Sequence, residues 1–267
     1  MIDEFCDFLK KKEMSPNTVQ VYMQTISMFY EVYKELNKTN VLAFKGYLLE
    51  QYKPRTVNLR IQAMNKYLTF IKKDDLKLTA VKIQQKPFLE NVISNGDYDF
   101  FKKKLKTEKK MEWYFVVRFL AATGARVSEL IQIKVEHVKL GYLDLYSKGG
   151  KMRRIYFPAK LQKEALKWFE EVSLTSGYIF LNWKKERITT RGIALGLKRL
   201  AIEYGIDPKV VYPHSFRHRF AKNFIEKYND ISFLADLMGH DSIETTRIYL
   251  RKTSTEQREI VDRIIVW

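Results

Sequence analysis

The sequence lacks the features that stabilise small secreted proteins or anchor membrane proteins. Its single cysteine, Cys6, excludes an internal disulfide framework and a cysteine-based zinc site within one chain. No apolar run approaches the roughly 20 residues that a membrane-spanning helix needs. The N-terminus is acidic from Asp3 and has no long apolar stretch, unlike a secretory signal. We therefore expect a cytoplasmic protein with no membrane partner.

Acidic residues are also in deficit. The 267 residues include 48 Lys and Arg against 31 Asp and Glu, which gives a formal net charge of +17 and a pI of about 9.6. Such an excess attracts polyanions, so nucleic acid is the leading partner, although a basic surface can also serve solubility alone. The hydrophobic content of 46% is enough for packed cores and argues against a disordered chain.

Residues 1–76 have the pattern of an all-helical unit. Ser15 followed by Pro16 is typical of a helix start, and apolar residues then recur at helical spacing up to Leu36. Further amphipathic stretches cover residues 2–9, 41–52 and 56–72. The periodicity lapses over residues 77–90, which predicts a linker to a second domain at 91–267.

The second domain has a mixed pattern. Helical periodicity covers residues 98–105, 112–123, 159–172, 189–204, 214–228 and 231–238. Between them, two alternating segments at 143–146 and 154–157 flank the turn Lys148-Gly149-Gly150-Lys151, which predicts a β-hairpin with a basic tip. The fold class is therefore mainly α with a small antiparallel β-sheet.

An arginine lies at a predicted helix terminus in the segment T-G-x-R-x-S-E-L, residues 123–130. Gly124 ends one helix where the next begins, so Arg126 can contribute to an anion site there. The alternative is a structural ion pair between Arg126 and Glu129, which are three residues apart.

Pro213 opens a helix that carries two further candidates. His214 and Arg217 lie three residues apart, hence on one face, and can converge on one ligand. His218 is predicted to be a packing or hydrogen-bonding histidine rather than a catalyst. Downstream, a helix ends in the glycine of L-x-G-H, residues 237–240, and a tyrosine follows at 249. Taken alone, Tyr249 between two apolar residues would be a core residue.

The order and spacing of these motifs resemble the tyrosine recombinase family, also called phage integrases. Residues 15–18 and 55–58 resemble the family's helical core-binding domain, so the resemblance covers nearly the whole chain. It implies a SAM-like DNA-binding domain at 1–76 and a mixed α/β catalytic domain of tyrosine recombinase type at 91–267, with a tail at 251–267. None of the family's six catalytic positions is substituted: Arg126, Lys148, His214, Arg217, His240 and Tyr249.

The resemblance implies a reaction without metal or ATP. The Tyr249 phenol attacks a DNA phosphate and leaves a 3′-phosphotyrosine, which conserves the bond energy for rejoining. The two arginines and two histidines stabilise the added negative charge. The sequence has no carboxylate or histidine cluster at the spacing of paired Mg²⁺ ligands, so no cofactor or metal is expected.

The remaining roles follow from family positions. Lys148 is assigned as the acid that protonates the leaving 5′-oxygen, with Lys151 as the alternative. His214 accepts the proton of Tyr249, and Glu129 orients Arg126. The expected contacts to the DNA backbone are Arg55, Arg60, Lys66, Lys151, Arg153, Arg154, Arg191 and Arg219.

The resemblance also implies an assembly. Family members form a homotetramer or heterotetramer on two double-stranded DNA sites, exchange C-terminal tails and pass through a Holliday junction. The tail's apolar stripe at residues 260–265 fits such an exchange, and packing on its own domain is the alternative.

The biological role is open between several functions. We expect no arm-binding domain before the helical unit, and this favours a compact Xer-type recombinase that resolves chromosome or plasmid dimers. The alternatives are an integrase or transposase of a mobile element, a type IB topoisomerase that relaxes DNA, and a DNA-binding protein without catalysis.

Overall fold

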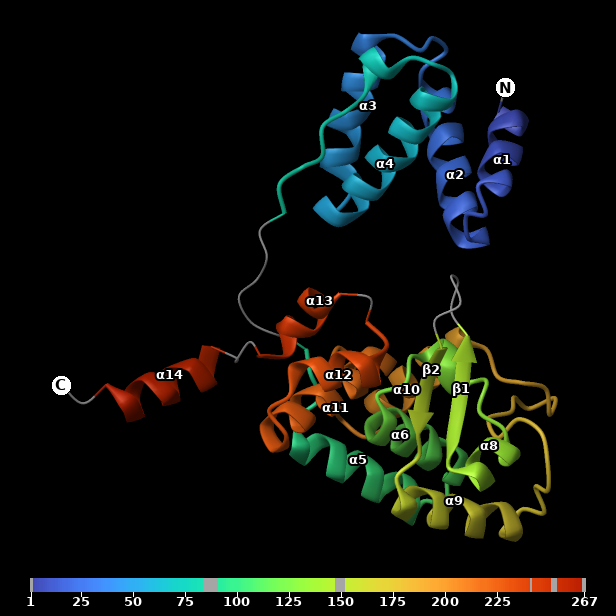
Figure 1. Ribbon diagram of the computed structural model, residues 1–267, viewed down its shortest axis with the longest axis vertical. Coiled ribbons are helices and arrows are strands. Elements are labelled where there is room, and N and C mark those ends of the chain that lie inside the picture. Colours follow the sequence, from blue (N-terminus) through green and yellow to red (C-terminus); the bar gives the residue numbers. More distant parts are fainter. Residues whose placement is uncertain (1, 84–90, 147–151, 241, 251–253, 266–267) are drawn as a thin grey trace. The chain divides into compact units, whose positions relative to one another are not determined.

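The chain folds into two compact units that divide at residue 85 (Figure 1). The computed structural model describes residues 2–83, 91–146, 152–240, 242–250 and 254–265. Helices predominate in both units, and one small antiparallel sheet lies in the second, so the predicted fold class is confirmed. Within these ranges, no helix combines the length and apolar character that crossing a membrane requires.

The N-terminal unit is a helical bundle. Ser15 begins the second helix as predicted, because its side chain accepts a hydrogen bond from the Thr18 backbone N–H at 3.2 Å and Pro16 fits the first turn. The core combines aliphatic and aromatic side chains; Phe29 and Phe44, for example, meet edge to face at 5.4 Å. The helices are α1 (Ile2–Lys11), α2 (Pro16–Val32), α3 (Lys38–Gln51) and α4 (Pro54–Phe70), with a short 3₁₀ turn, η1 (Asp74–Leu76).

The segment after η1 remains part of this unit. The side-chain amide of Asn65 exchanges two hydrogen bonds with the backbone of Leu78, both of 2.8 Å, and Asn58 does the same with Val81 at 2.7 and 2.9 Å. Residues 77–83 therefore run along α4, although the sequence pattern placed them in the linker. Apolar periodicity could not reveal this, because the two asparagines of α4 supply the attachment. The rest of the predicted linker, 84–90, lies outside the described residues.

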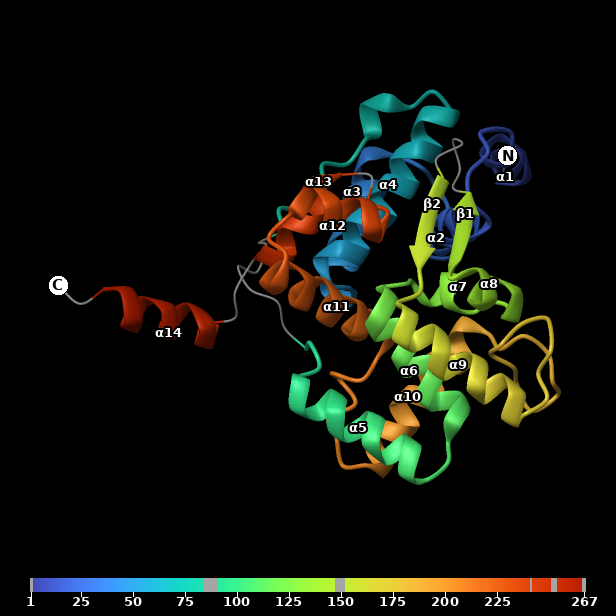
Figure 2. The ribbon, with the colours of Figure 1, turned by 60° about the horizontal axis from the view of Figure 1, so that its bottom comes forward.

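The second unit is built around α6 (Met111–Thr123), which contacts α5, α9 and α11 (Figures 1 and 2). This helix is apolar on most of its circumference, which is the composition expected of a helix enclosed by others. The other helices of this unit up to residue 238 are α5 (Asn95–Thr107), α7 (Val127–Leu130), α8 (Val135–Leu140), α9 (Ala159–Glu171), α10 (Thr190–Glu203), α11 (Pro213–Lys227) and α12 (Ile231–Met238).

The predicted hairpin strands are confirmed. β1 (Tyr142–Tyr146) pairs antiparallel with β2 (Met152–Tyr156), with Tyr142 opposite Tyr156 and Tyr146 opposite Met152. The turn between them, with Lys148 and Lys151, lies outside the described residues.

The C-terminal elements follow α12, which also contacts β2 and α11. They are α13 (Ile243–Arg247), the 3₁₀ turn η2 (Ile248–Leu250) and α14 (Ser254–Ile264). Ala221, Leu234, Met238 and Tyr249 form a small apolar cluster distinct from the main core of the unit. The residue predicted as nucleophile is therefore held by a cluster of its own.

Candidate active site

Arg217 lies at the centre of the polar network in the second unit. Pro213 opens α11, and one turn later Arg217 is only 2% exposed. Its guanidinium donates hydrogen bonds to the carbonyl oxygens of Gly124 at 2.5 Å and Met238 at 2.7 Å. Burial, together with the nearby guanidiniums of Arg126 and Arg153, lowers the pKa of Arg217 to about 10. The side chain is therefore still charged at neutral pH.

Arg126 enters the same network from the turn between α6 and α7. Gly124 ends α6 with φ +61°, and a Cβ there would lie 2.4 Å from the Phe220 ring, so the position requires glycine. Arg126 then donates to the Gly239 carbonyl at 2.8 Å, and its ion pair with Glu129, also 2.8 Å, is present as well. The ion pair between Arg126 and Glu129 therefore does not exclude a role of Arg126 in an anion site.

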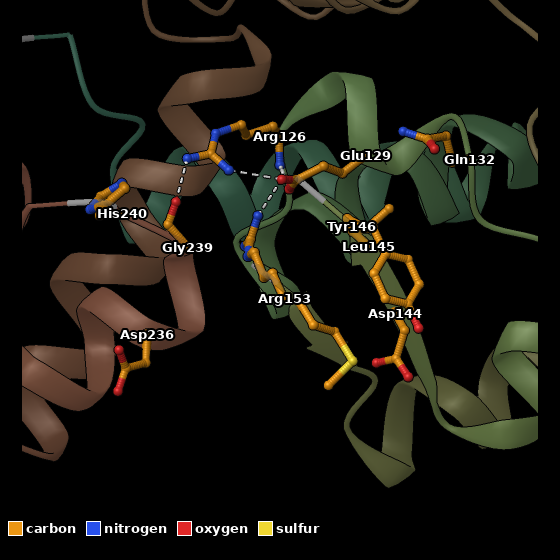
Figure 3. A pocket seen from close by; sticks show the side chains of 11 residues that line it. Arg126, Glu129, Gln132, Asp144, Leu145, Tyr146, Arg153, Asp236, Gly239 and His240 are labelled. Carbon is orange, nitrogen blue, oxygen red and sulfur yellow. Dashed lines mark hydrogen bonds and ion pairs between the residues drawn. The ribbon is translucent and has the colours of Figure 1, made fainter. Parts of the chain in front are cut away.

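Glu129 connects this arginine to the β-hairpin. Its carboxylate pairs with both Arg126 and Arg153 (Figure 3). Burial alone would raise the pKa of Glu129, but the guanidiniums of Arg153 and Arg126 lower it overall. The carboxylate is therefore charged and buried, at 8% exposure.

Arg153 is tied to the end of α12 rather than extended into solvent. Its guanidinium donates to the Leu237 carbonyl at 2.9 and 3.2 Å. Gly239 has φ +60°, and a Cβ on it would lie 2.2 Å from the Arg153 side chain. The glycine of the L-x-G-H motif is thus required both by its backbone conformation and by the path of Arg153.

His240 follows that glycine and contacts Arg217. Its Nε2 lies 3.0 Å from the Arg217 guanidinium, and its Nδ1 lies 2.7 Å from the hydroxyl of the buried Thr246. Because a guanidinium can only donate, Nε2 accepts, and the neutral ring carries its proton on Nδ1 toward Thr246. Arg217 therefore sets the tautomer of His240, and Thr246 helps to hold the orientation of its ring.

Tyr249 lies beside these groups on η2 and is only 5% exposed. Its ring is nearly parallel to that of His240, at an interplanar angle of 12° and 6.3 Å between centroids. Its hydroxyl lies 3.1 Å from Nδ1 of His218. Burial raises the pKa of Tyr249, while the positive charge of Arg217 acts in the opposite direction.

His214 lies on the same helix face as Arg217 but remains exposed. Partial desolvation and the charges of Arg217 and Arg126 lower its pKa, so the imidazole is neutral at pH 7. Its ring is 6.3 Å from that of His218. The structure thus brings Arg126, Arg217, His240 and Tyr249 into one network with His214 at its edge.

An open groove of about 980 Å³ extends from this network along the hairpin. Figure 3 shows Arg126 and His240 on one side of it and Asp144 and Tyr146 on the other. Within the described ranges, no three His, Cys, Asp or Glu side chains are grouped so that they could hold a metal ion.

The residues predicted to contact DNA lie in diverse settings. In the second unit, Arg191 is exposed at the start of α10, whereas Arg154 forms a two-pronged ion pair with Asp144 at 2.7 and 2.8 Å. Arg219 stacks on the Tyr98 ring at 3.9 Å, at the contact between α11 and α5. The structure does not bring Arg219 to the groove.

In the N-terminal unit, Arg55 is exposed at the start of α4. Arg60 stacks over Tyr52 at 4.6 Å and donates to Thr25 at 3.3 Å. The Lys66 ammonium is 5.9 Å from the centre of the Phe8 ring. The contacts of Arg60 and Lys66 lie within the N-terminal unit.

The sequence predicted a packing or hydrogen-bonding role for His218, but two pairings in the site were not anticipated. His218 contacts the tyrosine hydroxyl, and Thr246 binds His240. The spacing of four between His214 and His218 was a usable signal, because it places both on one helix face. Thr246 gave no comparable signal.

Comparison with known proteins shows the family to which the chain belongs. A model of the phage integrase family matches residues 95–256. The chain is 29% identical to tyrosine recombinase XerA of Pyrococcus furiosus over 98% of this chain and 93% of that protein, and 25% identical to XerD of Oceanobacillus iheyensis over 97% and 96%. A solved structure of the Tn1549 transposon integrase with circular intermediate DNA has a TM-score of 0.73 at 15% identity, covering 98% of this chain and 99% of that one.

Fold and family together define an enzyme that transfers DNA strands, a tyrosine recombinase. Because the matched segment covers more than half of the chain, the protein belongs to the phage integrase family. The family resemblance seen in the sequence is thereby confirmed, and the similarity to Xer recombinases extends over nearly the full length.

The paired, buried carboxylate of Glu129 predicts a pH-dependent stability. Its pKa is lowered in the folded state, so its contribution is present above the unfolded pKa of about 4.3 and is lost as the pH falls through the folded value. We expect Glu129→Gln to lower the free energy of unfolding by about 3–5 kcal/mol at pH 7, and the difference from the unsubstituted protein to shrink as the pH falls below about 4.

Urea unfolding at several pH values measures this difference. Glu244→Gln is the matched control, because Glu244 pairs with Arg247 at 3.0 Å on the exposed surface and should matter little. A loss at Glu129 that is independent of pH, or no larger than the control, contradicts the prediction.

Proposed function

We propose that this protein is a site-specific recombinase that cleaves and rejoins double-stranded DNA through a 3′-phosphotyrosine at Tyr249. The observation that carries the proposal is the meeting of a tyrosine, a histidine and two arginines from separate segments. Tyr249 lies beside His240, His240 contacts Arg217, and Arg126 binds the turn that carries His240. The Tn1549 integrase, which shares the fold, is described in complex with DNA, which supports DNA as the substrate.

The electrostatics of the network suit a phosphodiester. A phosphate gains negative charge as the phenolic oxygen attacks, and guanidiniums present paired donors to its non-bridging oxygens. Arg126 and Arg217 are fixed by carbonyl contacts before any DNA binds. Little reorganisation is then needed when the charge develops, which is the condition under which such donors stabilise a transition state most.

The proton movements can be assigned to two residues. In the first step a bond forms between Tyr249 and phosphorus, and the bond from phosphorus to the 5′-oxygen breaks. His214 accepts the phenolic proton, which its lowered pKa permits because the ring is unprotonated at neutral pH. Lys148, from the hairpin tip, donates a proton to the leaving 5′-oxygen. A 5′-hydroxyl of another strand then reverses these steps, so the bond energy is retained and no ATP is consumed.

DNA contacts outside the catalytic network are proposed for two groups of basic residues. Arg55 and Arg191 are exposed and can reach a backbone directly. Lys151 belongs to the hairpin tip, while Arg60, Lys66, Arg153, Arg154 and Arg219 already have contacts within the chain and would share them with phosphates. Release of counterions by such contacts makes binding fall steeply with salt.

The similarity to XerA and XerD favours a Xer-like role, the resolution of chromosome or plasmid dimers. Strand exchange in such a role requires two DNA sites held in one assembly. We propose a tetramer in which α14 of one subunit docks on the next. Val261 and Ile264 on α14 are about half exposed, and a patch of Phe224, Tyr228 and Phe233 offers an apolar surface, with ring centroids 5.8–6.2 Å apart.

Tyr249→Phe tests the nucleophile directly, because it removes one oxygen and keeps the ring in its cluster. We expect covalent protein–DNA adducts to disappear on denaturing gels, while the dissociation constant for the DNA site changes less than about threefold. Mapping the adduct in the unsubstituted protein should identify residue 249. Adducts that persist in Tyr249→Phe refute the assignment.

Lys148→Ala tests whether Lys148 is the general acid that protonates the leaving 5′-oxygen. The variant should cleave ordinary DNA at least about 100-fold more slowly, since general acid catalysis typically contributes that much. A substrate with a 5′-thiol leaving group needs little protonation and should restore the rate. Lys151→Ala is the matched control from the same turn and should need no such rescue. Rescue of Lys151→Ala but not Lys148→Ala would reassign the role.

Removal of residues 259–267 tests the assembly. We expect binding to a single DNA site to stay within about twofold and formation of a complex of two sites to weaken at least about tenfold, since an apolar contact worth 1.4 kcal/mol changes affinity by that factor. Arg263→Ala, a surface change on the same helix, is the control. Unchanged pairing of the two sites would favour a tail packed on its own domain.

A further inference from the structure

The hydroxyl of Tyr249 is held by a histidine that has no role in the scheme above. His218 Nδ1 lies 3.1 Å from the phenolic oxygen, and the two rings are 5.4 Å apart. His240, by contrast, faces the tyrosine ring and directs its own nitrogens to Arg217 and Thr246. His218 therefore supplies a directional polar contact to the nucleophilic oxygen, beside the Arg217 guanidinium that also interacts with it.

The position of His218 in α11 links this contact to the phosphate site. His218 follows Arg217 directly and lies one turn after His214, so a single helix carries a phosphate ligand, the proposed proton acceptor and the partner of Tyr249. A helix is a rigid support, and a side chain mounted on it keeps a fixed relation to its neighbours. We propose that His218 is a positioning residue that aligns the Tyr249 hydroxyl with the phosphate bound at Arg217. This inference rests on the proposed function of Tyr249.

Apolar packing alone does not fix the direction of the hydroxyl. The Tyr249 ring is buried with Ala221, Leu234 and Met238, which set its depth in the cluster. Contacts of this kind are not directional, whereas a hydrogen bond weakens steeply when its angle or length changes. An oxygen that must approach phosphorus in line gains from a directional partner.

The pKa values of His218 and Tyr249 distinguish a positioning role of His218 from that of a general base. Burial, with the positive charge of Arg217, lowers the pKa of His218 to about 4, while burial raises that of Tyr249 above its usual value of about 10. In the site without DNA, transfer of the proton from Tyr249 to His218 is therefore strongly disfavoured. His218 thus holds the hydroxyl without removing its proton.

The test compares reactions that use Tyr249 with one that does not. His218→Leu removes the hydrogen bond, and His218→Asn keeps a polar atom close to the Nδ1 position. The second reaction uses Tyr249→Phe protein and a DNA strand activated as a 3′-p-nitrophenyl phosphate. The 5′-hydroxyl of a second strand attacks phosphorus there and passes its proton to Lys148, the reverse of the acid step. The bond to the nitrophenyl oxygen breaks, and p-nitrophenolate leaves without an acid. This rejoining needs the arginines and histidines but no tyrosine.

We expect His218→Leu to lower the rate constant of cleavage at saturating DNA about 3- to 10-fold, the effect of one neutral hydrogen bond, with DNA affinity unchanged. His218→Asn should recover most of that loss. In the Tyr249→Phe background, neither change should alter rejoining of the activated strand by more than about twofold.

His137→Leu is the matched control, because His137 also accepts a hydrogen bond at Nδ1, from the Lys134 backbone at 3.1 Å, on α8 outside the network. It should leave cleavage unchanged.

Three outcomes overturn the proposal. Cleavage by His218→Leu at the unsubstituted rate means that the contact has no role. A loss of 100-fold or more means that His218 acts as the base. An equal loss in rejoining of the activated strand means that His218 supports the phosphate site or the fold. Failure of Tyr249→Phe to abolish adducts would instead contradict the proposed function, so the two failures are distinguishable.

Discussion

A buried guanidinium holds the catalytic unit together. Arg217 donates to the carbonyls of Gly124 and Met238, which lie at the C-terminal ends of α6 and α12. The C-terminal end of a helix has carbonyl groups without hydrogen-bond partners and carries a partial negative charge. A guanidinium placed there both donates to these carbonyls and interacts favourably with the negative charge. The residue proposed to bind phosphate is therefore also the cap that joins two helices, and its structural and chemical roles cannot be separated.

The same arrangement recurs twice at the end of α12. Arg126 binds the Gly239 carbonyl and Arg153 binds that of Leu237, so three guanidiniums gather where one helix ends. Glu129 is a carboxylate among them and pairs with two of the three. The cluster keeps an excess of positive charge in a partly buried place, and an anionic ligand relieves the mutual repulsion that the arginines retain.

Capping residues, periodicity and short motifs predicted many of the helices and strands. The features that they missed are contacts between residues distant in the sequence. The cap at Ser15 and the hairpin strands follow from turn chemistry and periodicity over a few residues. The family motifs identified Arg217 and Tyr249, although no short segment explains why these two meet. The tie of Arg153 to α12 and the contact of His218 with Tyr249 join residues more than 30 positions apart. Apolar patterning carries no information on such polar pairings.

The separate cluster around Tyr249 has a consequence for the energy landscape of the unit. Ala221, Leu234 and Met238 enclose the tyrosine, while the main core packs around α6 without them. Regions with few apolar contacts open at a free energy below that of global unfolding. The C-terminal end of this unit can thus rearrange as a subglobal opening event. The side chain proposed as nucleophile is then able to leave and regain its place while the main core stays folded.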